Sequence, residues 1–227
     1  MPNPVSIVMV KAPRAGAVKT RLVPALSGAE AASLAACFAK DWVANARRVV
    51  GQVIVAYAPS DGRPALEKLL PHDDLLWHEQ RGEDLGARLE TAARYAASQD
   101  FSPIIITGAD SPTLPTSFIE TAIDSLATNK SDIVLCPTDD GGYCLVGLRR
   151  ITDSLFQNIQ WSTPLAYGQT AENAARLKMR SLALPRWYDV DTFADLLRLR
   201  DEMLATKAAR AQAPSTHQWL LTHDALF

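Results

Sequence analysis

Short apolar runs alternate with longer amphipathic stretches along the chain, and this alternation indicates the fold class. The apolar runs are rich in Val and Ile and predict strands at residues 5–10, 53–57, 75–78, 104–106, 132–136, 143–148 and 181–184. The amphipathic stretches predict helices at about 28–48, 64–70, 82–98 and 115–127, from 167 to about 178, and again after 192. This regular succession predicts an α/β protein with a parallel sheet.

The first long helix has the clearest start signal. Ser27 and Glu30 have the spacing of a capping box, in which each side chain satisfies a backbone N–H at the helix start. Leu34, Phe38 and Trp42 then follow on one helical stripe. We therefore expect this helix to be part of the core scaffold.

The run 104–106 is the strand from which we predict the binding site. Three consecutive isoleucines indicate a strand buried on both faces of a parallel sheet, and Gly108 and Asp110 follow directly. Ligands of open α/β sheets bind at the carboxyl ends of the strands, so Asp110 is a candidate ligand-binding carboxylate. The structural alternative is an aspartate that caps the next helix.

The loop after the first strand carries the second candidate group. Lys11, Lys19 and Arg21 supply positive charge and Gly16 allows a tight turn, a combination suited to a diphosphate. The loop matches neither the P-loop pattern GxxxxGK[ST] nor the dinucleotide pattern GxGxxG. A solvated basic loop without a ligand is the alternative explanation.

Two acidic stretches follow later strands. Asp139 and Asp140 precede a Gly-Gly turn, which is either a simple hairpin or a functional loop at the end of a strand. Asp189 and Asp191 follow the last predicted strand, where Asp191 or Thr192 can cap the next helix. Because carboxyl ends of parallel strands share one edge, Asp110, Asp189 and Asp191 are predicted to meet there. Gln80, Asp84 and Arg88 could also reach a ligand, but a capped helix start explains the acidic residues of this segment equally well.

Composition limits the remaining classes. The chain has 227 residues, 48% of them hydrophobic, which suits one domain spanning residues 1–227. The 23 basic and 25 acidic residues nearly balance, so we expect no nucleic-acid partner. Three cysteines without CxxC spacing favour a reducing cytoplasm, and no apolar run is long enough for a membrane span. The oligomeric state is not encoded in these features.

Six motifs, in order along the chain, resemble a known family. They are KAPRAGAVKTRL from Lys11, GEDLGAR from Gly82, GADSPTLP from Gly108, DDGGYCLVGL from Asp139, QWSTP from Gln160 and DVDTFADL from Asp189. Together they resemble the glycosyltransferase-A-like transferases associated with radical-SAM and selenodomain proteins. The front end, VKTRLVPALSGAEAASLAACFAKD, also resembles phospholactate guanylyltransferase, and DVDTFADL resembles the NxNTPEDL motif of molybdenum cofactor guanylyltransferases.

The resemblance implies a Rossmann-like three-layer sandwich with a mostly parallel mixed sheet, the nucleotide-diphosphosugar transferase fold. It implies an enzyme that uses a nucleotide or nucleotide-sugar donor, a small-molecule acceptor and Mg²⁺ or Mn²⁺. The expected nucleotide-binding residues are Lys11, Gly16, Lys19, Arg21 and Gly108. The expected metal ligands are Asp110, Asp189 and Asp191. On the acceptor side we expect Asp139 or Asp140 as the general base, beside Gly141, Gly142 and Tyr143.

Two departures from the related families bear on the reaction. The paired-glycine LAGGxGxR loop of typical nucleotidyltransferases is replaced by a stretch with the single Gly16, and aspartates stand at 189 and 191 where the guanylyltransferases have asparagines. Both departures weaken the transfer of either exact reaction to this chain. We favour transfer of a sugar, because the family is usually described so and the paired-glycine loop is lacking. Nucleotidyl transfer and a non-catalytic nucleotide-binding module are the alternatives.

Overall fold

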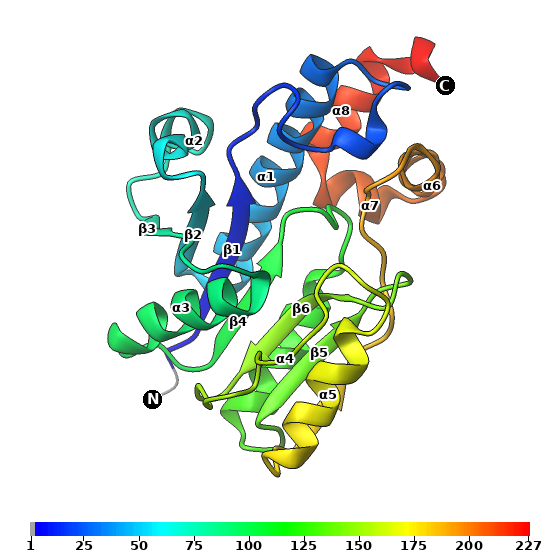
Figure 1. The fold of residues 1–227 in the computed structure, drawn as a ribbon. Coiled ribbons are helices and arrows are strands. Elements are labelled where there is room, and N and C mark those ends of the chain that lie inside the picture. The colour runs from blue at the N-terminus through cyan, green and yellow to red at the C-terminus, as the bar shows by residue number, and fades with distance from the viewer. Residues whose placement is uncertain (1–2) are drawn as a thin grey trace.

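The computed structural model describes residues 3–227, in which seven strands form one sheet with helices on both faces (Figure 1). The strands are β1 (Val5–Lys11), β2 (Val53–Ala58), β3 (Leu76–Glu79), β4 (Ile104–Gly108), β5 (Ile133–Pro137), β6 (Tyr143–Leu148) and β7 (Ser181–Ala183). The helices are α1 (Gly28–Val50), α2 (Arg63–Leu69), α3 (Leu85–Ser98), α4 (Thr116–Ala127), α5 (Ala166–Arg176), α6 (Phe193–Ala205), α7 (Lys207–Gln212) and α8 (Pro214–Thr222). Short 3₁₀ turns lie at Thr20–Leu22, Ser60–Gly62 and Asp224–Leu226.

The strand order is β3-β2-β1-β4-β6-β5-β7, and only β6 runs antiparallel to its neighbours. The predicted mostly parallel mixed sheet is therefore confirmed. Its one antiparallel strand follows the Gly-Gly turn, which returns the chain directly after β5. As a result, the carboxyl ends of β1, β4 and β5 lie at one edge of the sheet, together with the loops that follow them.

Two apolar layers hold the helices against the sheet. On one face, Val8 of β1 shares a core cluster with Trp42 of α1 and Ile119 of α4. On the other face, Ile7 of β1 shares a cluster with Leu89 of α3. Neighbouring residues of a strand point to opposite faces, so one Val- and Ile-rich run supplies both layers.

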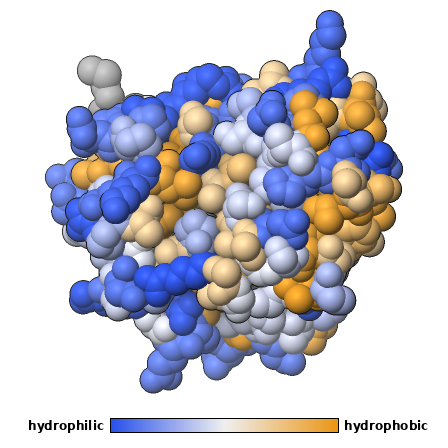
Figure 2. Space-filling view, turned by 90° about the horizontal axis from the view of Figure 1, so that it is seen from above, coloured by the Kyte–Doolittle hydropathy of each residue, from blue (hydrophilic) through white to orange (hydrophobic). Residues whose placement is uncertain are grey.

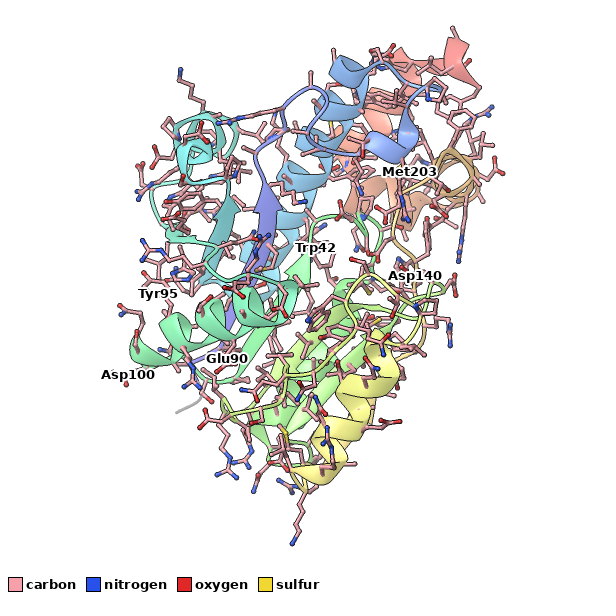
Figure 3. All side chains as sticks on the ribbon, viewed as in Figure 1. Trp42, Glu90, Tyr95, Asp100, Asp140 and Met203 are labelled. Carbon is pink, nitrogen blue, oxygen red and sulfur yellow. The ribbon has the colours of Figure 1, made fainter. Side chains whose placement is uncertain are left out.

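A third apolar cluster lies on the far side of α1. Leu34 and Phe38 pack there with Met203 of α6 and Trp219 of α8, whereas Trp42 faces the sheet (Figure 3). The stripe predicted for α1 therefore divides between two cores, because the C-terminal helices cover the side of α1 that would otherwise face solvent. Within residues 3–227, no helix combines the length and the apolar character needed to cross a membrane.

Asp132, just before β5, connects β5 with β6 and β7 at the edge of the sheet opposite the carboxyl ends of β1, β4 and β5. Its carboxylate accepts hydrogen bonds from Arg149 Nε at 3.0 Å and from Arg180 Nε at 2.9 Å and backbone N at 3.0 Å. Arg149 follows β6 and Arg180 precedes β7. The hydrogen bonds from Arg180, followed by those from Arg149, hold the pKa of Asp132 well below its usual value of 3.8.

The Asp132 carboxylate should make stability depend on pH. Its pKa is lower in the folded chain than in the unfolded chain, so its contribution is present above about pH 4 and is lost as the pH falls through the folded value. We expect Asp132→Asn to destabilise the protein by about 2 kcal/mol at pH 7, and the difference from wild type should shrink steadily below about pH 4. Urea unfolding at several pH values measures both. A difference that does not vary with pH would contradict the assignment.

Candidate functional site

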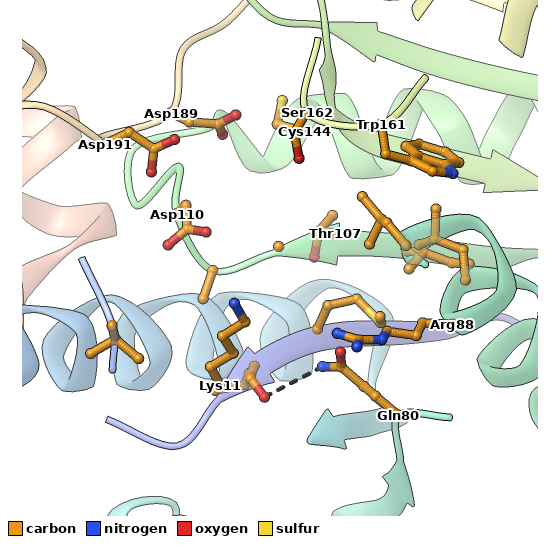
Figure 4. A pocket seen from close by; sticks show the side chains of 18 of the residues that line it. Lys11, Gln80, Arg88, Thr107, Asp110, Cys144, Trp161, Ser162, Asp189 and Asp191 are labelled. Atoms are coloured by element: carbon orange, nitrogen blue, oxygen red, sulfur yellow. Dashed lines mark hydrogen bonds between the residues drawn. The ribbon is translucent and has the colours of Figure 1, made fainter. Parts of the chain in front are cut away.

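A cavity of about 740 Å³ opens at the carboxyl ends of β1 and β4 (Figure 4). Its walls come from the end of β1, the loop at 17–21, the end of β4, the start of α3 and one side of β6. Its charged lining consists of Lys11, Lys19, Arg21, Glu83, Asp84, Arg88, Asp110, Asp189 and Asp191. Seen from above, most of the surface is hydrophilic, with apolar residues gathered in patches (Figure 2). This is the edge at which the sheet topology predicts a ligand.

Within the basic loop, the three predicted cations lie in different environments. Lys11 is exposed at the end of β1, and the Arg21 side chain is 73% exposed. The Lys19 side chain is only 6% exposed, and its Nζ contacts Asp110 Oδ1 at 2.5 Å and Asp191 Oδ1 at 3.0 Å. The sequence predicts Lys19 as a phosphate ligand, whereas in this structure its side chain is buried against two carboxylates. Its ammonium neutralises carboxylates inside the site.

The pKa of Lys19 reflects this position. Burial alone would lower the pKa, but the charges of Asp110 and Asp191 and their hydrogen bonds outweigh burial and raise it above the usual 10.5. Lys19 therefore stays protonated at neutral pH. Gly16 lies in the turn before Lys19 with a φ of +76°, a left-handed conformation that favours glycine, and it does not line the cavity.

The three predicted carboxylates do meet at one edge. Asp110 and Asp191 are joined through Lys19, and Asp189 lies next to them, where Ser111 donates a hydrogen bond from Oγ to Asp189 Oδ1. Burial raises the pKa of Asp189 to about 7; the Ser111 hydrogen bond opposes this shift, and the neighbouring charges of Asp110 and Asp191 add to it. Within the described part of the chain, Asp189 forms no ion pair with a lysine or arginine, unlike its two neighbours.

The oxygen donors of this cluster suit Mg²⁺ or Mn²⁺, but their arrangement does not. In residues 3–227, no three His, Cys, Asp or Glu side chains are placed to hold one metal ion. Lys19 Nζ contacts both Asp110 Oδ1 and Asp191 Oδ1. In this conformation the pair holds an ammonium group.

A second cavity of about 250 Å³ adjoins the first, and Arg21, Asp189 and Asp191 line both. Its outer wall carries both predicted general bases. Asp139 pairs with Arg198 Nη1 at 2.7 Å, and Arg198 lies over the Tyr188 ring at 3.9 Å from the centroid. The residues shared by the two cavities form a common wall.

Asp140, Gly141 and Gly142 lie in the turn after β5, and Tyr143 follows at the start of β6. Asp140 Oδ1 accepts hydrogen bonds from Gly142 N at 3.0 Å and from Thr138 Oγ1 at 2.5 Å. Neither Gly141 nor Gly142 lines a cavity. Tyr143 lines the larger cavity, and its buried hydroxyl has no hydrogen-bond partner among the described residues.

Gly141 should not tolerate a side chain. It has a φ of +88°, and an added Cβ would lie 2.3 Å from the Pro164 carbonyl oxygen. We expect Gly141→Ala to destabilise the protein by about 2 kcal/mol or more. Gly168→Ala in α5 is the matched control, because its Cβ would meet no atom within 4 Å and alanine favours a helix. Thermal unfolding compares the two, and equal melting temperatures would contradict the close approach of Pro164.

Several cavity residues were not singled out by the sequence as ligand contacts. They are Thr107, Cys144, Trp161 and Ser162, all labelled in Figure 4. Thr107 lies near the end of an apolar strand, and Cys144 lies near the start of a strand with alternating polarity. A polar side chain near one end of a strand was the only feature of the sequence that could have marked either residue as a ligand contact. Trp161 and Ser162 reach the cavity from a loop far along the chain. Both belong to the QWSTP motif from Gln160, to which the sequence analysis assigned no role.

Gln80 and Arg88, which the sequence did suggest, also line the cavity. Gln80 Nε2 donates to Ala56 O at 2.7 Å and Val10 O at 3.4 Å, which fixes the amide beside β1. Arg88 Nε donates to Gly82 O at 3.2 Å. Asp84 accepts a hydrogen bond from Ala87 N at 2.8 Å and thereby caps α3, although it also lines the cavity.

Solved structures place this architecture in a fold class. A protein from Desulfovibrio desulfuricans G20, described as a candidate nucleotide-diphospho-sugar transferase, is 29% identical with a TM-score of 0.89, over 100% of this chain and 97% of that one. A cytidylyltransferase from Leptospira borgpetersenii is 11% identical with a TM-score of 0.56, over 100% and 97%. The CMP:2-keto-3-deoxy-manno-octonic acid synthetase in complex with CTP is 11% identical with a TM-score of 0.56, over 89% and 99%.

The fold is therefore that of the nucleotide-diphospho-sugar transferases and cytidylyltransferases. The chain itself belongs to the family described as "Uncharacterized protein conserved in bacteria (DUF2064)", whose model matches residues 42–163, more than half of the 227 residues. No curated protein sequence matches the chain. The family description assigns no reaction.

Proposed function

We propose that this protein is a transferase that takes a group from a nucleotide-activated donor, with a sugar from a nucleotide diphosphosugar as the favoured group. The observation that carries the proposal is the 740 Å³ cavity at the carboxyl ends of β1 and β4, whose lining combines lysines and arginines with carboxylates. Its volume lies within the usual range for small-molecule and cofactor sites, about 300–1,000 Å³. The fold shared with the Desulfovibrio protein supports the same class.

Lys11 and Arg21 are the residues proposed to bind the donor's phosphates. Both line the cavity, and neither takes part in the buried ion pairs of Lys19. Lys11 is exposed, and Arg21 contacts Asp191 only at 3.7 Å. Charge-assisted hydrogen bonds from such side chains are the usual way in which proteins hold a diphosphate. Gly108 lines the same cavity and would leave room for the donor there, whereas Gly16 would act through the shape of the loop.

The acceptor is proposed to enter through the second cavity. This cavity has room for about eight waters at ~30 Å³ each, so the acceptor or its reactive end is small. Five aspartates and two arginines line it, which favours an acceptor with hydroxyl or ammonium groups over a phosphorylated one. The wall that the two cavities share would then be the place of transfer.

Asp189 is the carboxylate best placed to take the acceptor's proton. It lines both cavities, and Ser111 orients it. In a sugar transfer, the acceptor oxygen or nitrogen would bond to the anomeric carbon, the bond from that carbon to the diphosphate would break, and the proton would pass to the base. Asp139 remains the second candidate, since its carboxylate lies on the outer wall of the acceptor cavity.

Sugar transfer and nucleotidyl transfer release different products, and this difference tests the proposal. A nucleotide sugar used as glycosyl donor releases a nucleoside diphosphate, whereas a nucleoside triphosphate used for nucleotidyl transfer releases pyrophosphate. Panels of both donors would be incubated with small polyols and amines, with and without Mn²⁺, and both products measured. Nucleoside diphosphate release that requires an acceptor supports the proposal. Pyrophosphate release favours the nucleotidyltransferase alternative, and binding without turnover favours a nucleotide-binding module.

A further inference from the structure

The indole N–H of Trp161 is a buried donor without an acceptor. The Trp161 side chain lines the larger cavity, but its Nε1 atom is shielded from solvent and has no hydrogen-bond partner among residues 3–227. Trp161 belongs to the QWSTP motif, which has no role in the proposed function. A buried donor that has lost its bonds to water costs free energy until an acceptor replaces them. The position of the indole in this structure therefore leaves its polar atom unsatisfied.

The indole is held at this position by packing alone. A Cβ added at Gly86, in the first turn of α3, would lie 2.9 Å from both Nε1 and Cζ2 of Trp161. The edge of the indole that carries the N–H therefore lies directly against the glycine. The Tyr143 ring meets the indole edge to face, with 6.2 Å between the ring centroids. Because neither contact is a hydrogen bond, the side chain can leave both without losing one.

The backbone on both sides of Trp161 is anchored, which leaves the side chain as the part that can move. Gln160 N donates to Gln169 Oε1 at 2.7 Å, and Thr163 Oγ1 donates to Gln160 O at 2.7 Å. These bonds hold a tight turn that has Trp161 and Ser162 at its tip. A change of side-chain rotamer at Trp161 requires no change in this turn.

The cavity next to the indole offers it a second position. Its volume is about 740 Å³, and Trp161 forms part of its wall. In Figure 4, Trp161 lies on the opposite side of the cavity from Lys11, which is proposed to bind phosphate. A nucleotide whose phosphates contact Lys11 would therefore bring an uncharged ring, and not its phosphates, towards Trp161. The rings of sugars and nucleosides carry hydroxyl or carbonyl oxygens, which accept hydrogen bonds.

We propose that Trp161 is a ligand-binding residue of the larger cavity, whose side chain leaves Gly86, turns into the cavity and donates its indole N–H to an oxygen on an uncharged ring of the donor. The gain is the hydrogen bond that the indole lacks when it lies against Gly86. The ligand then selects a side-chain position that is already populated in its absence. The ligand step rests on the proposed function, whereas the movement of the side chain does not.

Hydrogen exchange of the indole N–H protons in the ligand-free protein, followed by NMR, tests the movement. The matched control is Trp187, whose Nε1 is also buried without a partner in the described chain but which lines neither cavity. After correction for intrinsic rates, the Trp161 proton should be at least about tenfold less protected than the Trp187 proton. It should also be less protected than the Gln160 amide, because only the side chain moves. Trp161→Phe and Trp187→Phe assign the two signals, and triple-resonance spectra of the wild type assign them if a variant does not fold.

Equal protection of the two indole protons would overturn the proposal. Equal protection of the Trp161 indole and the Gln160 amide would also overturn it, because the whole loop would then open. No nucleotide is used in this measurement, so failure of the proposed function would leave its result unaffected.

The ligand step is tested by following the same signals while nucleoside diphosphates and the corresponding nucleotide sugars are added. A downfield shift of the Trp161 proton, with the Trp187 proton unchanged, supports the proposal. A shift with the diphosphate alone assigns the acceptor oxygen to the nucleoside, and a shift only with the nucleotide sugar assigns it to the sugar. A probe that binds without moving the Trp161 signal would overturn the ligand step. Absence of any binding would contradict the proposed function and the ligand step together, while the exchange result would still decide the movement.

Discussion

Asp189→Asn should lower turnover by about a hundredfold or more while changing donor affinity by less than about threefold. Asparagine keeps the size of the side chain and can still accept the hydrogen bond from Ser111, but it cannot take a proton from the acceptor. Asp189 lines the wall common to both cavities, and in residues 3–227 it has no ion-pair partner to neutralise it. Steady-state kinetics and donor titration measure the two quantities separately.

Comparison of Asp140→Asn with Asp189→Asn shows which of the two aspartates is the general base. Because Asp140 Oδ1 already accepts from Gly142 N and Thr138 Oγ1, we expect its replacement to cost less than about tenfold in turnover. A hundredfold loss at Asp140 with little change at Asp189 would reverse the assignment and restore the base predicted from the sequence. A loss of donor affinity in Asp189→Asn would make Asp189 a donor ligand instead.

Asp41→Ala should cause the largest loss of stability, about 3 kcal/mol or more. Asp41 lies on α1 with 3% exposure, and its carboxylate accepts hydrogen bonds from Ser215 N at 2.9 Å, Thr216 N at 2.8 Å and Thr216 Oγ1 at 2.7 Å. These groups belong to the first turn of α8, and without the carboxylate the buried Thr216 N–H would have no partner. Denaturant unfolding gives the loss directly.

Asp84→Ala is the control for Asp41→Ala. Asp84 also accepts a hydrogen bond from a helix start, but it is exposed, and water can replace the lost bond. Its replacement should cost about 1 kcal/mol. Equal losses for the two variants would contradict the claim that burial of the α8 start, and not the capping bond alone, makes Asp41 important.

Local sequence patterns were sufficient to predict the sheet and the edge of it at which the candidate site lies. Buried Val and Ile runs identify the strands, the capping box of Ser27 and Glu30 is present, and the Gly-Gly turn, for which a hairpin was one of two alternatives, joins β5 to the antiparallel β6. Asp110 and Asp191 could be placed together because parallel strands end at one edge. These inferences need only periodicity and backbone geometry, which are properties of short segments.

Contacts between segments that are far apart in the chain could not be predicted from the sequence. Lys19 looked like a phosphate ligand because charge is visible in a sequence, whereas the direction of a loop side chain depends on the 190–191 segment that it meets. Asp41 lies on a helical stripe next to Trp42, and nothing near it indicates a bond to a helix more than 170 residues later. The division of α1 between two cores likewise depends on where α6 and α8 pack.

The central claim is that the larger cavity binds a nucleotide through its phosphates, and calorimetric titration with nucleoside diphosphates and their sugars tests it most directly. Lys11 lines only the larger cavity and Arg198 only the smaller one. We expect wild type and Arg198→Ala to bind the preferred nucleotide equally and Lys11→Ala to bind it about tenfold more weakly. Binding weakened equally by both changes, or no binding of any nucleotide at millimolar concentration, would contradict the account.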